Sequence, residues 1–114
     1  MLKVHAKKSD DITVHYLEGS IINGETEVLR DAVQSASDIT LNLSKVTIVD
    51  AHGLGVLLEL REQALAKGAH FELINVSKRL YRIFEITRLN TVFDISSKVH
   101  FLPQFAYSQR VLAA

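Results

Sequence analysis

The sequence predicts an α/β fold in a single domain that spans residues 1–114. Short strand-like segments alternate with segments of helical periodicity, in the order β-β-α-β-α-β-α-β-α. Strands that are separated by whole helices favour parallel pairing through right-handed crossovers. Hydrophobic residues make up 47% of the 114 residues, which is enough apolar surface to bury a core.

The first part of the chain contains three predicted strands and one predicted helix. Residues Ile12 to Leu17 are β-branched and aromatic and roughly alternate in polarity, which predicts a strand, and an earlier strand begins near Val4. Residues 39–43 alternate cleanly and predict the next strand. Between them, Glu25 to Ser37 has the apolar spacing of a helix. The predicted buried face of this helix consists of Val28, Leu29, Ala32, Val33 and Ala36.

The second part continues the alternation of helices and strands. Asp50 can accept a bond from the backbone amides that follow it, so a helix is predicted to begin there and to end at Gly68. Ser77 can cap another helix in the same way. The remaining predicted elements are a strand over His70–Val76, a helix over Lys78–Leu89, a strand over Thr91–Ile95 and a last helix from Pro103 to about Leu112.

The composition excludes several classes of function. Thirteen basic and thirteen acidic side chains cancel in formal charge, so nucleic acid is not an expected partner. The absence of cysteine excludes disulfides, thiolate metal ligands and a thiol nucleophile. The N-terminus lacks the apolar core of a signal peptide, and no segment approaches the ~20 apolar residues needed to cross a bilayer. We therefore expect a soluble cytoplasmic protein without membrane insertion, whose near-zero charge permits a homodimer or a protein partner.

The polar residues do not form a recognisable catalytic or metal site. The five histidines have no pair at the spacing of metal ligands, and only His52 lies at a predicted helix start. Gly53-Leu54-Gly55 lacks the third glycine of a dinucleotide-binding motif, so these glycines are expected to let the helix start pack closely on a strand. No serine is placed for activation by His52. We expect no enzyme activity, no cofactor and no metal.

Two blocks of sequence resemble the STAS domain family, named for sulfate transporters and anti-sigma-factor antagonists. "ITLNLSKVTIVDAHGLGVLLEL" is similar to the family's strand, loop, Asp-Ser-Ser/Thr-Gly-Leu-Gly motif and helix. "GAHFELINVSKRLYRIFEITRLNTVFDI" is similar to the strand, helix and last strand that follow. The resemblance covers essentially the whole chain and implies a mixed β-sheet with helices on its flanks. It also implies a regulatory module that binds an anti-sigma factor and so releases a sigma factor.

The resemblance implies a phosphorylation switch that this sequence lacks. In stand-alone members, the serine directly after the Asp is phosphorylated by the anti-sigma factor, which is also a serine kinase, and phosphorylation abolishes binding. That position is Ala51 here, which has no oxygen to phosphorylate, and the next hydroxyl position is His52. Two further polar positions of the family are altered, to Asn42 and Ile22. The expected partner-binding residues are Asp50, Ala51, His52, Gly53, Leu54 and Gly55.

Three functions remain open at this level. The first is an anti-sigma-factor antagonist that is not switched at residue 51. The second is a soluble STAS-type accessory subunit docked to the ATPase of an ABC-type membrane transport complex. The third and weakest is a small enzyme that uses Asp50 and His52. Ser20, Ser44 and Thr47 are further hydroxyls near the expected surface, for which loop and capping roles are expected.

Overall fold

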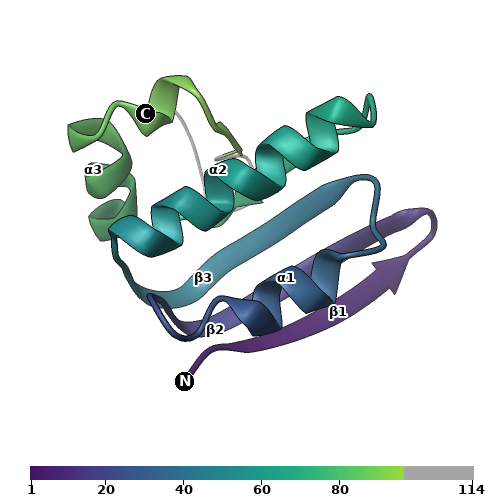
Figure 1. Ribbon diagram of the computed structural model, residues 1–114, viewed down its shortest axis with the longest axis horizontal. Helices are drawn as coiled ribbons and strands as arrows, with labels where there is room; N and C mark the ends of the chain where they lie inside the picture. Colours follow the sequence, from purple (N-terminus) through teal and green to yellow (C-terminus); the bar gives the residue numbers. More distant parts are fainter. Residues whose placement is uncertain (97–114) are drawn as a thin grey trace, which may run out of the picture.

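The computed structural model of the protein describes residues 1–96. Within them, a five-stranded sheet is combined with three α-helices and one 3-10 helix (Figure 1). The strands lie in the sheet in their order along the chain. The elements are β1 (Lys3–Ser9), β2 (Ile12–Ile21), α1 (Glu27–Val33), β3 (Ile39–Val49), α2 (Ala51–Ala66), β4 (Phe71–Ile74), α3 (Lys78–Ile86), η1 (Leu89–Thr91) and β5 (Asp94–Ser96).

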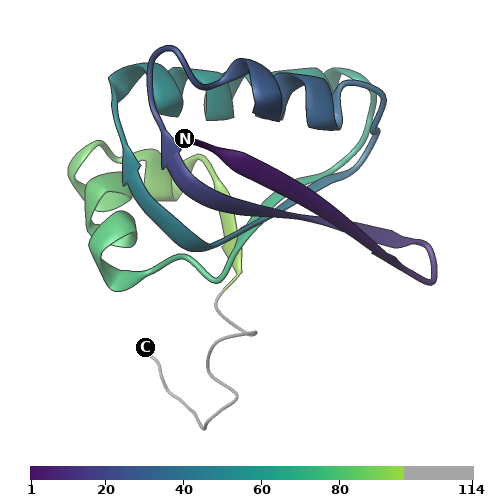
Figure 2. The same cartoon turned by 90° about the horizontal axis from the view of Figure 1, so that it is seen from below.

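The sheet is mixed, as predicted. β1 and β2 form an antiparallel hairpin, whereas β2, β3, β4 and β5 run parallel to one another. Figure 2 shows α1 and α2 side by side over one face of the sheet, with α3 beside its β4–β5 end. Because each helix follows the carboxyl end of a parallel strand, the loops before α1, α2 and α3 all lie at one edge of the sheet. In open parallel sheets this edge is where binding sites usually form.

The core lies between the sheet and the helices. Alternate residues of the strands point into it, and one face of each helix covers them. The rings of Phe71 and Phe84 pack against Phe93, with centroids 5.9 and 5.5 Å apart, which joins β4 and α3 to the chain before β5. The fully buried large side chains are Leu17, Ile21, Leu29, Leu41, Leu43, Val56, Leu57, Leu60, Leu73 and Phe84.

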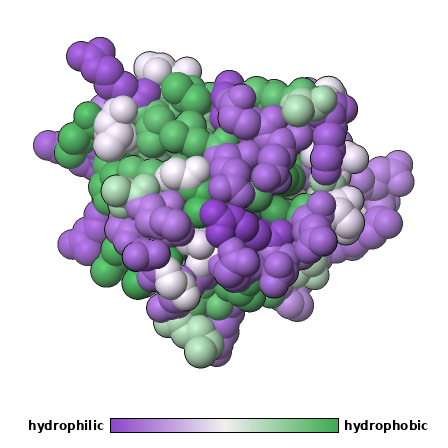
Figure 3. All heavy atoms as spheres, in the orientation of Figure 1, coloured by the Kyte–Doolittle hydropathy of each residue, from purple (hydrophilic) through white to green (hydrophobic). Residues whose placement is uncertain are grey.

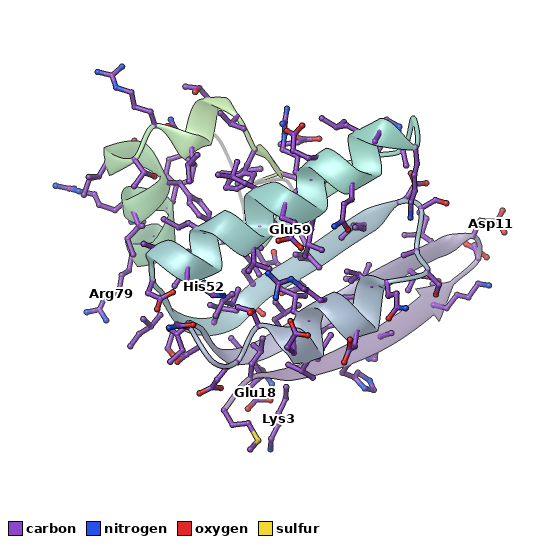
Figure 4. All side chains as sticks on the ribbon, in the orientation of Figure 1. Lys3, Asp11, Glu18, His52, Glu59 and Arg79 are labelled. Atoms are coloured by element: carbon purple, nitrogen blue, oxygen red, sulfur yellow. The ribbon has the colours of Figure 1, made fainter. Side chains whose placement is uncertain are left out.

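A bidentate ion pair connects α1 and α2 at the surface. The guanidinium of Arg30 donates to both carboxylate oxygens of Glu59, at 2.9 and 3.1 Å. This bond lowers the pKa of Glu59 and raises that of Arg30. Figure 4 shows Glu59 on the side of α2 that faces α1. Exposed ion pairs contribute little to stability, but this geometry fixes how the two helices lie against each other.

Strand β3 is longer than predicted. We expected it to end at Leu43, but it continues to Val49 because its second half pairs with β2, from Lys45 opposite Glu18 to Val49 opposite Ile21. The pairing passes two register shifts, and Asn42 accepts a bond from the amide of Ser44 at 3.0 Å. The polar Ser44-Lys45 pair and this irregularity interrupt the alternation that marks a strand in sequence.

The predicted helices and the later strands are right in type and order, but most are too long. α1 covers Glu27–Val33 instead of 25–37, and Val28 and Ala32 are exposed instead of buried, because the helix buries only the stripe through Leu29 and Val33. α3 ends at Ile86, before the left-handed Arg88 (φ 63°), which a continuing helix could not accommodate. The two strands around α3 are shorter than, or shifted from, the predicted ranges. The helix predicted after Pro103 lies outside the described residues.

Candidate functional site

Asp50 joins two loops at the edge of the sheet. It is the N-cap of α2, as predicted, and its Oδ1 accepts a bond from the amide of Gly53 at 2.8 Å. Its Oδ2 accepts a second bond from the amide of Asn23, in the loop before α1, at 3.0 Å. These bonds, that of Asn23 foremost, lower the pKa of the Asp50 carboxyl group. The carboxylate therefore holds the start of α2 and the β2–α1 loop in one arrangement.

Gly53 brings the start of α2 against the sheet. A Cβ atom at this residue would lie 1.9 Å from the carbonyl oxygen of Ile21, at the end of β2. The same oxygen accepts a bond from the amide of Asp50 at 3.3 Å. The prediction that glycine permits close packing is therefore confirmed at Gly53. It is wrong at Gly55, where a Cβ atom would meet nothing within 4 Å because that face of α2 points to solvent.

His52 makes a second connection between the same two loops. Its Nε2 lies 3.3 Å from Oγ1 of Thr26, a buried residue that precedes α1. The remaining surface of His52 is exposed, and so is Ala51 beside it. Figure 4 shows His52 at the beginning of α2, on the side of the molecule that faces away from the β1–β2 turn at Asp11. The helix start thus presents a methyl group and an imidazole in fixed positions.

The predicted site residues divide into an exposed and a supporting group. Ala51, His52 and Gly55 are exposed and Leu54 is half-buried, whereas Gly53 is buried. Asp50 is half-buried and acts on the backbone. Gly53 therefore positions the site and is not available for contact.

Sequence reasoning missed one surface residue near the site. Ile48, two residues before Asp50, is 57% exposed at the end of β3, and it was overlooked because β3 was predicted to end earlier. Asn42, which takes the place of a polar family residue, is buried and bonded to its own strand, so it does not belong to this surface. The hydroxyls of Ser20 and Thr47 lie 3.4 Å apart, and that of Thr47 donates to the carbonyl of Gly19.

The described residues meet neither the requirements of a metal-ion site nor those of a membrane-spanning helix. No group of three or more histidine, aspartate or glutamate side chains in residues 1–96 is arranged to hold a metal ion. No helix in the same part of the chain is long and apolar enough to cross a membrane.

Comparison with known proteins decides which family this geometry represents. The profile of the STAS domain matches residues 3–102, nearly the full length of the chain. The chain belongs to the STAS domain family. The prediction made from the two sequence blocks is thereby confirmed.

The relatives of this STAS domain are regulators by name. The anti-sigma-B factor antagonist of Bacillus subtilis is 32% identical over 102 residues, which cover 85% of this chain and 93% of that protein. An anti-sigma factor antagonist structure from Mycobacterium paratuberculosis has a TM-score of 0.72 at 18% identity, with coverage of 83% and 85%. Phosphorylated SpoIIAA of Bacillus has a TM-score of 0.63 at 17% identity, with coverage of 86% and 95%. The two structures confirm the predicted fold, and the first two relatives are named as antagonists of anti-sigma factors.

Proposed function

We propose that this STAS domain is an anti-sigma-factor antagonist and that it binds its anti-sigma factor through the start of α2. The relative from Bacillus subtilis, with its coverage of 93%, supports the class of function. The observation that carries the choice of surface is Asp50, whose two carboxylate oxygens each hold a different loop. Ala51 and His52 are thereby exposed on a backbone that is already ordered. A surface that is ordered before binding loses less conformational entropy in the complex.

The same geometry supports binding and not catalysis. The Asp50 oxygens accept bonds from the amides of Asn23 and Gly53, which is the role of a helix cap and not that of a general base. The ring of His52 is directed to the hydroxyl of Thr26, itself buried. Asp50 and His52 therefore support the two loops, and we assign no reaction to them.

We further propose that binding at this surface is not switched by a serine kinase at residue 51. Phosphoryl transfer needs an attacking hydroxyl oxygen, and Ala51 offers a methyl group. In switched members of the family a phosphate places about 1.5–2 negative charges at this contact surface. Without that charge, the occupancy of the complex depends on how much of each protein is present.

The test is calorimetric titration with the purified anti-sigma factor encoded in the same genome. Wild-type protein is compared with His52→Glu and with His5→Glu, the same substitution at an exposed histidine of β1. We expect His52→Glu to weaken binding at least about tenfold, since a new unpaired charge in an interface costs more than about 1.4 kcal/mol. His5→Glu is expected to bind as wild type does.

Equal affinity of wild type and His52→Glu would contradict the assigned surface. Failure of the wild-type protein to bind any anti-sigma factor of that genome would contradict the function itself. Binding to the ATPase of a transport complex in its place would establish the accessory-subunit function.

A further inference from the structure

Helix α3 carries basic charges that have no partner within the described part of the chain. Lys78, Arg79 and Arg82 are exposed, and the one acidic residue of α3 is Glu85. None of the three cations forms an ion pair within residues 1–96. A helix that carries three exposed cations and one carboxylate presents a positive surface to solvent.

The arginines of the other helices differ from those of α3. Arg30 pairs with Glu59 and Glu27, and Arg61 pairs with Glu62. Within residues 1–96, the arginines of α1 and α2 are therefore paired with carboxylates, whereas Arg79 and Arg82 of α3 are not.

Apolar side chains are exposed among these charges. Ile86, in the last turn of α3, is 74% exposed, and Tyr81 is 36% exposed. Leu54 and Leu58 of α2 and Ile83 of α3 are only half-buried against the core. Figure 3 shows apolar surface over the part of the molecule where α3 lies beside α2. An apolar centre with arginine and tyrosine at its margin is the composition of protein interfaces.

This surface lies at the same end of the molecule as the start of α2. Both helices begin at the edge of the sheet where the parallel strands end, α2 after β3 and α3 after β4. Figure 4 shows Arg79 and His52 at the same end of the molecule, opposite Asp11. Leu54, a residue of the proposed binding surface near the start of α2, has a half-buried side chain.

We propose that the exposed face of α3 is a second docking surface for the protein partner, and that it receives an acidic segment of that partner. We call the exposed residues Lys78, Arg79, Tyr81, Arg82 and Ile86 the α3 face. The inference rests on the proposed function, because the α3 face extends the surface at the start of α2. A protein fits better than a polyanion, because Ile86 and Tyr81 lie among the cations and the whole chain has no net charge.

The test is a charge reversal with a matched control. The double variant Arg79→Glu/Arg82→Glu is compared with Lys7→Glu/Lys8→Glu, which changes the net charge equally on β1, near the hairpin turn. A glutamate at residue 79 lies in the first turn of α3, where the helix dipole favours it, and both replaced side chains are exposed. Thermal unfolding of each variant checks that it is folded.

The measurement is the affinity for the purified anti-sigma factor at low and high salt. We expect the α3 variant to bind at least about tenfold more weakly at 0.05 M salt and its deficit to shrink at 0.5 M, where salt screens exposed charges. The β1 variant is expected to bind as wild type does.

Each of the other outcomes overturns the inference, and they differ in what they say about the function. If wild type binds, His52→Glu is weak and the α3 variant is unaffected, only the α3 face is wrong. Equal losses in both double variants would indicate long-range attraction and no docking at α3. If wild type does not bind the anti-sigma factor, the proposed function fails and the inference with it. Binding to phosphatidylglycerol vesicles that is lost in the α3 variant would assign the α3 face to a membrane.

Discussion

Replacing Gly53 by alanine is expected to destabilise the protein, whereas the same replacement at Gly55 is expected to stabilise it. The Cβ atom at residue 53 would lie 1.9 Å from the carbonyl oxygen of Ile21 and 3.0 Å from a methyl group of Val49. Because the nearest atom belongs to the backbone, a side-chain rotation cannot relieve the contact. The start of α2 must move away by about 1 Å or more, which also disturbs the bond from the amide of Asp50 to the same oxygen.

The expected magnitude follows from two opposing contributions. Overpacking of a buried contact costs about 1–3 kcal/mol, and a backbone collision this close belongs at the upper end. Replacing glycine by alanine inside a helix contributes about 1 kcal/mol in the other direction. Gly53→Ala is therefore expected to lower the free energy of unfolding by about 2 kcal/mol. At Gly55 no collision occurs, so only the stabilisation of about 1 kcal/mol remains.

Thermal and urea unfolding of the two variants and the wild type provide the assay. For a domain of this size, 1 kcal/mol corresponds to about 4 °C in Tm, so we expect a Tm lower by about 8 °C for Gly53→Ala and higher by about 4 °C for Gly55→Ala. The comparison within one helix cancels effects of helix propensity. A Gly53→Ala protein that is as stable as Gly55→Ala would refute the close approach of α2 to β2.

Three further predictions concern titration and modification. The pKa of the His15 imidazole is lowered by burial, so the neutral form is favoured in the folded protein. Wild type should therefore lose more stability than His15→Gln as the pH falls below 6.5, which Tm values between pH 7.5 and 5 would show. The pKa of Asp50 is lowered by the amides of Asn23 and Gly53. Its contribution to the free energy of unfolding is therefore present above the unfolded pKa of 3.8 and is lost as the pH falls through the lower folded value. Urea unfolding between pH 5 and 2.5 should show that Asp50→Asn loses less stability on acidification than wild type does. Incubation with the anti-sigma factor and ATP should place phosphate, detected by mass spectrometry, on the Ala51→Ser variant alone, and phosphate on wild-type Ser44, Thr47 or His52 would show that the acceptor lies elsewhere.

Local sequence patterns predicted the features, such as helix caps, that depend only on residues close together in the sequence. Asp50 was identified as the cap of α2 because the cap bond spans three residues, and Ser77 was identified for α3 in the same way, with a bond to Leu80 of 3.1 Å. The helix predicted to begin at Lys78 does begin there. Such features follow from the spacing of a few residues and need no knowledge of the rest of the chain.

Features that depend on contacts between distant segments were not predicted. The bond from Asn23 to Asp50 and the contact of Thr26 with His52 join residues that are 27 and 26 positions apart. The full length of β3 depends on its pairing with β2 across a bulge, and for this reason the exposure of Ile48 was missed. The cap at Asp50 could therefore be predicted from the sequence, but the β2–α1 loop that contacts it could be found only in three dimensions.

Strand β1 bears on how this protein can associate with itself. Within the described residues it pairs only with β2, so the amides and carbonyls of its other side are open to another strand. Lys3, Lys7 and Lys8 lie along this strand, and a second copy added in parallel and in register would place each lysine opposite its counterpart. Like charges opposite each other destabilise strand pairs. We therefore expect these lysines to disfavour a dimer joined through continuous sheets along β1.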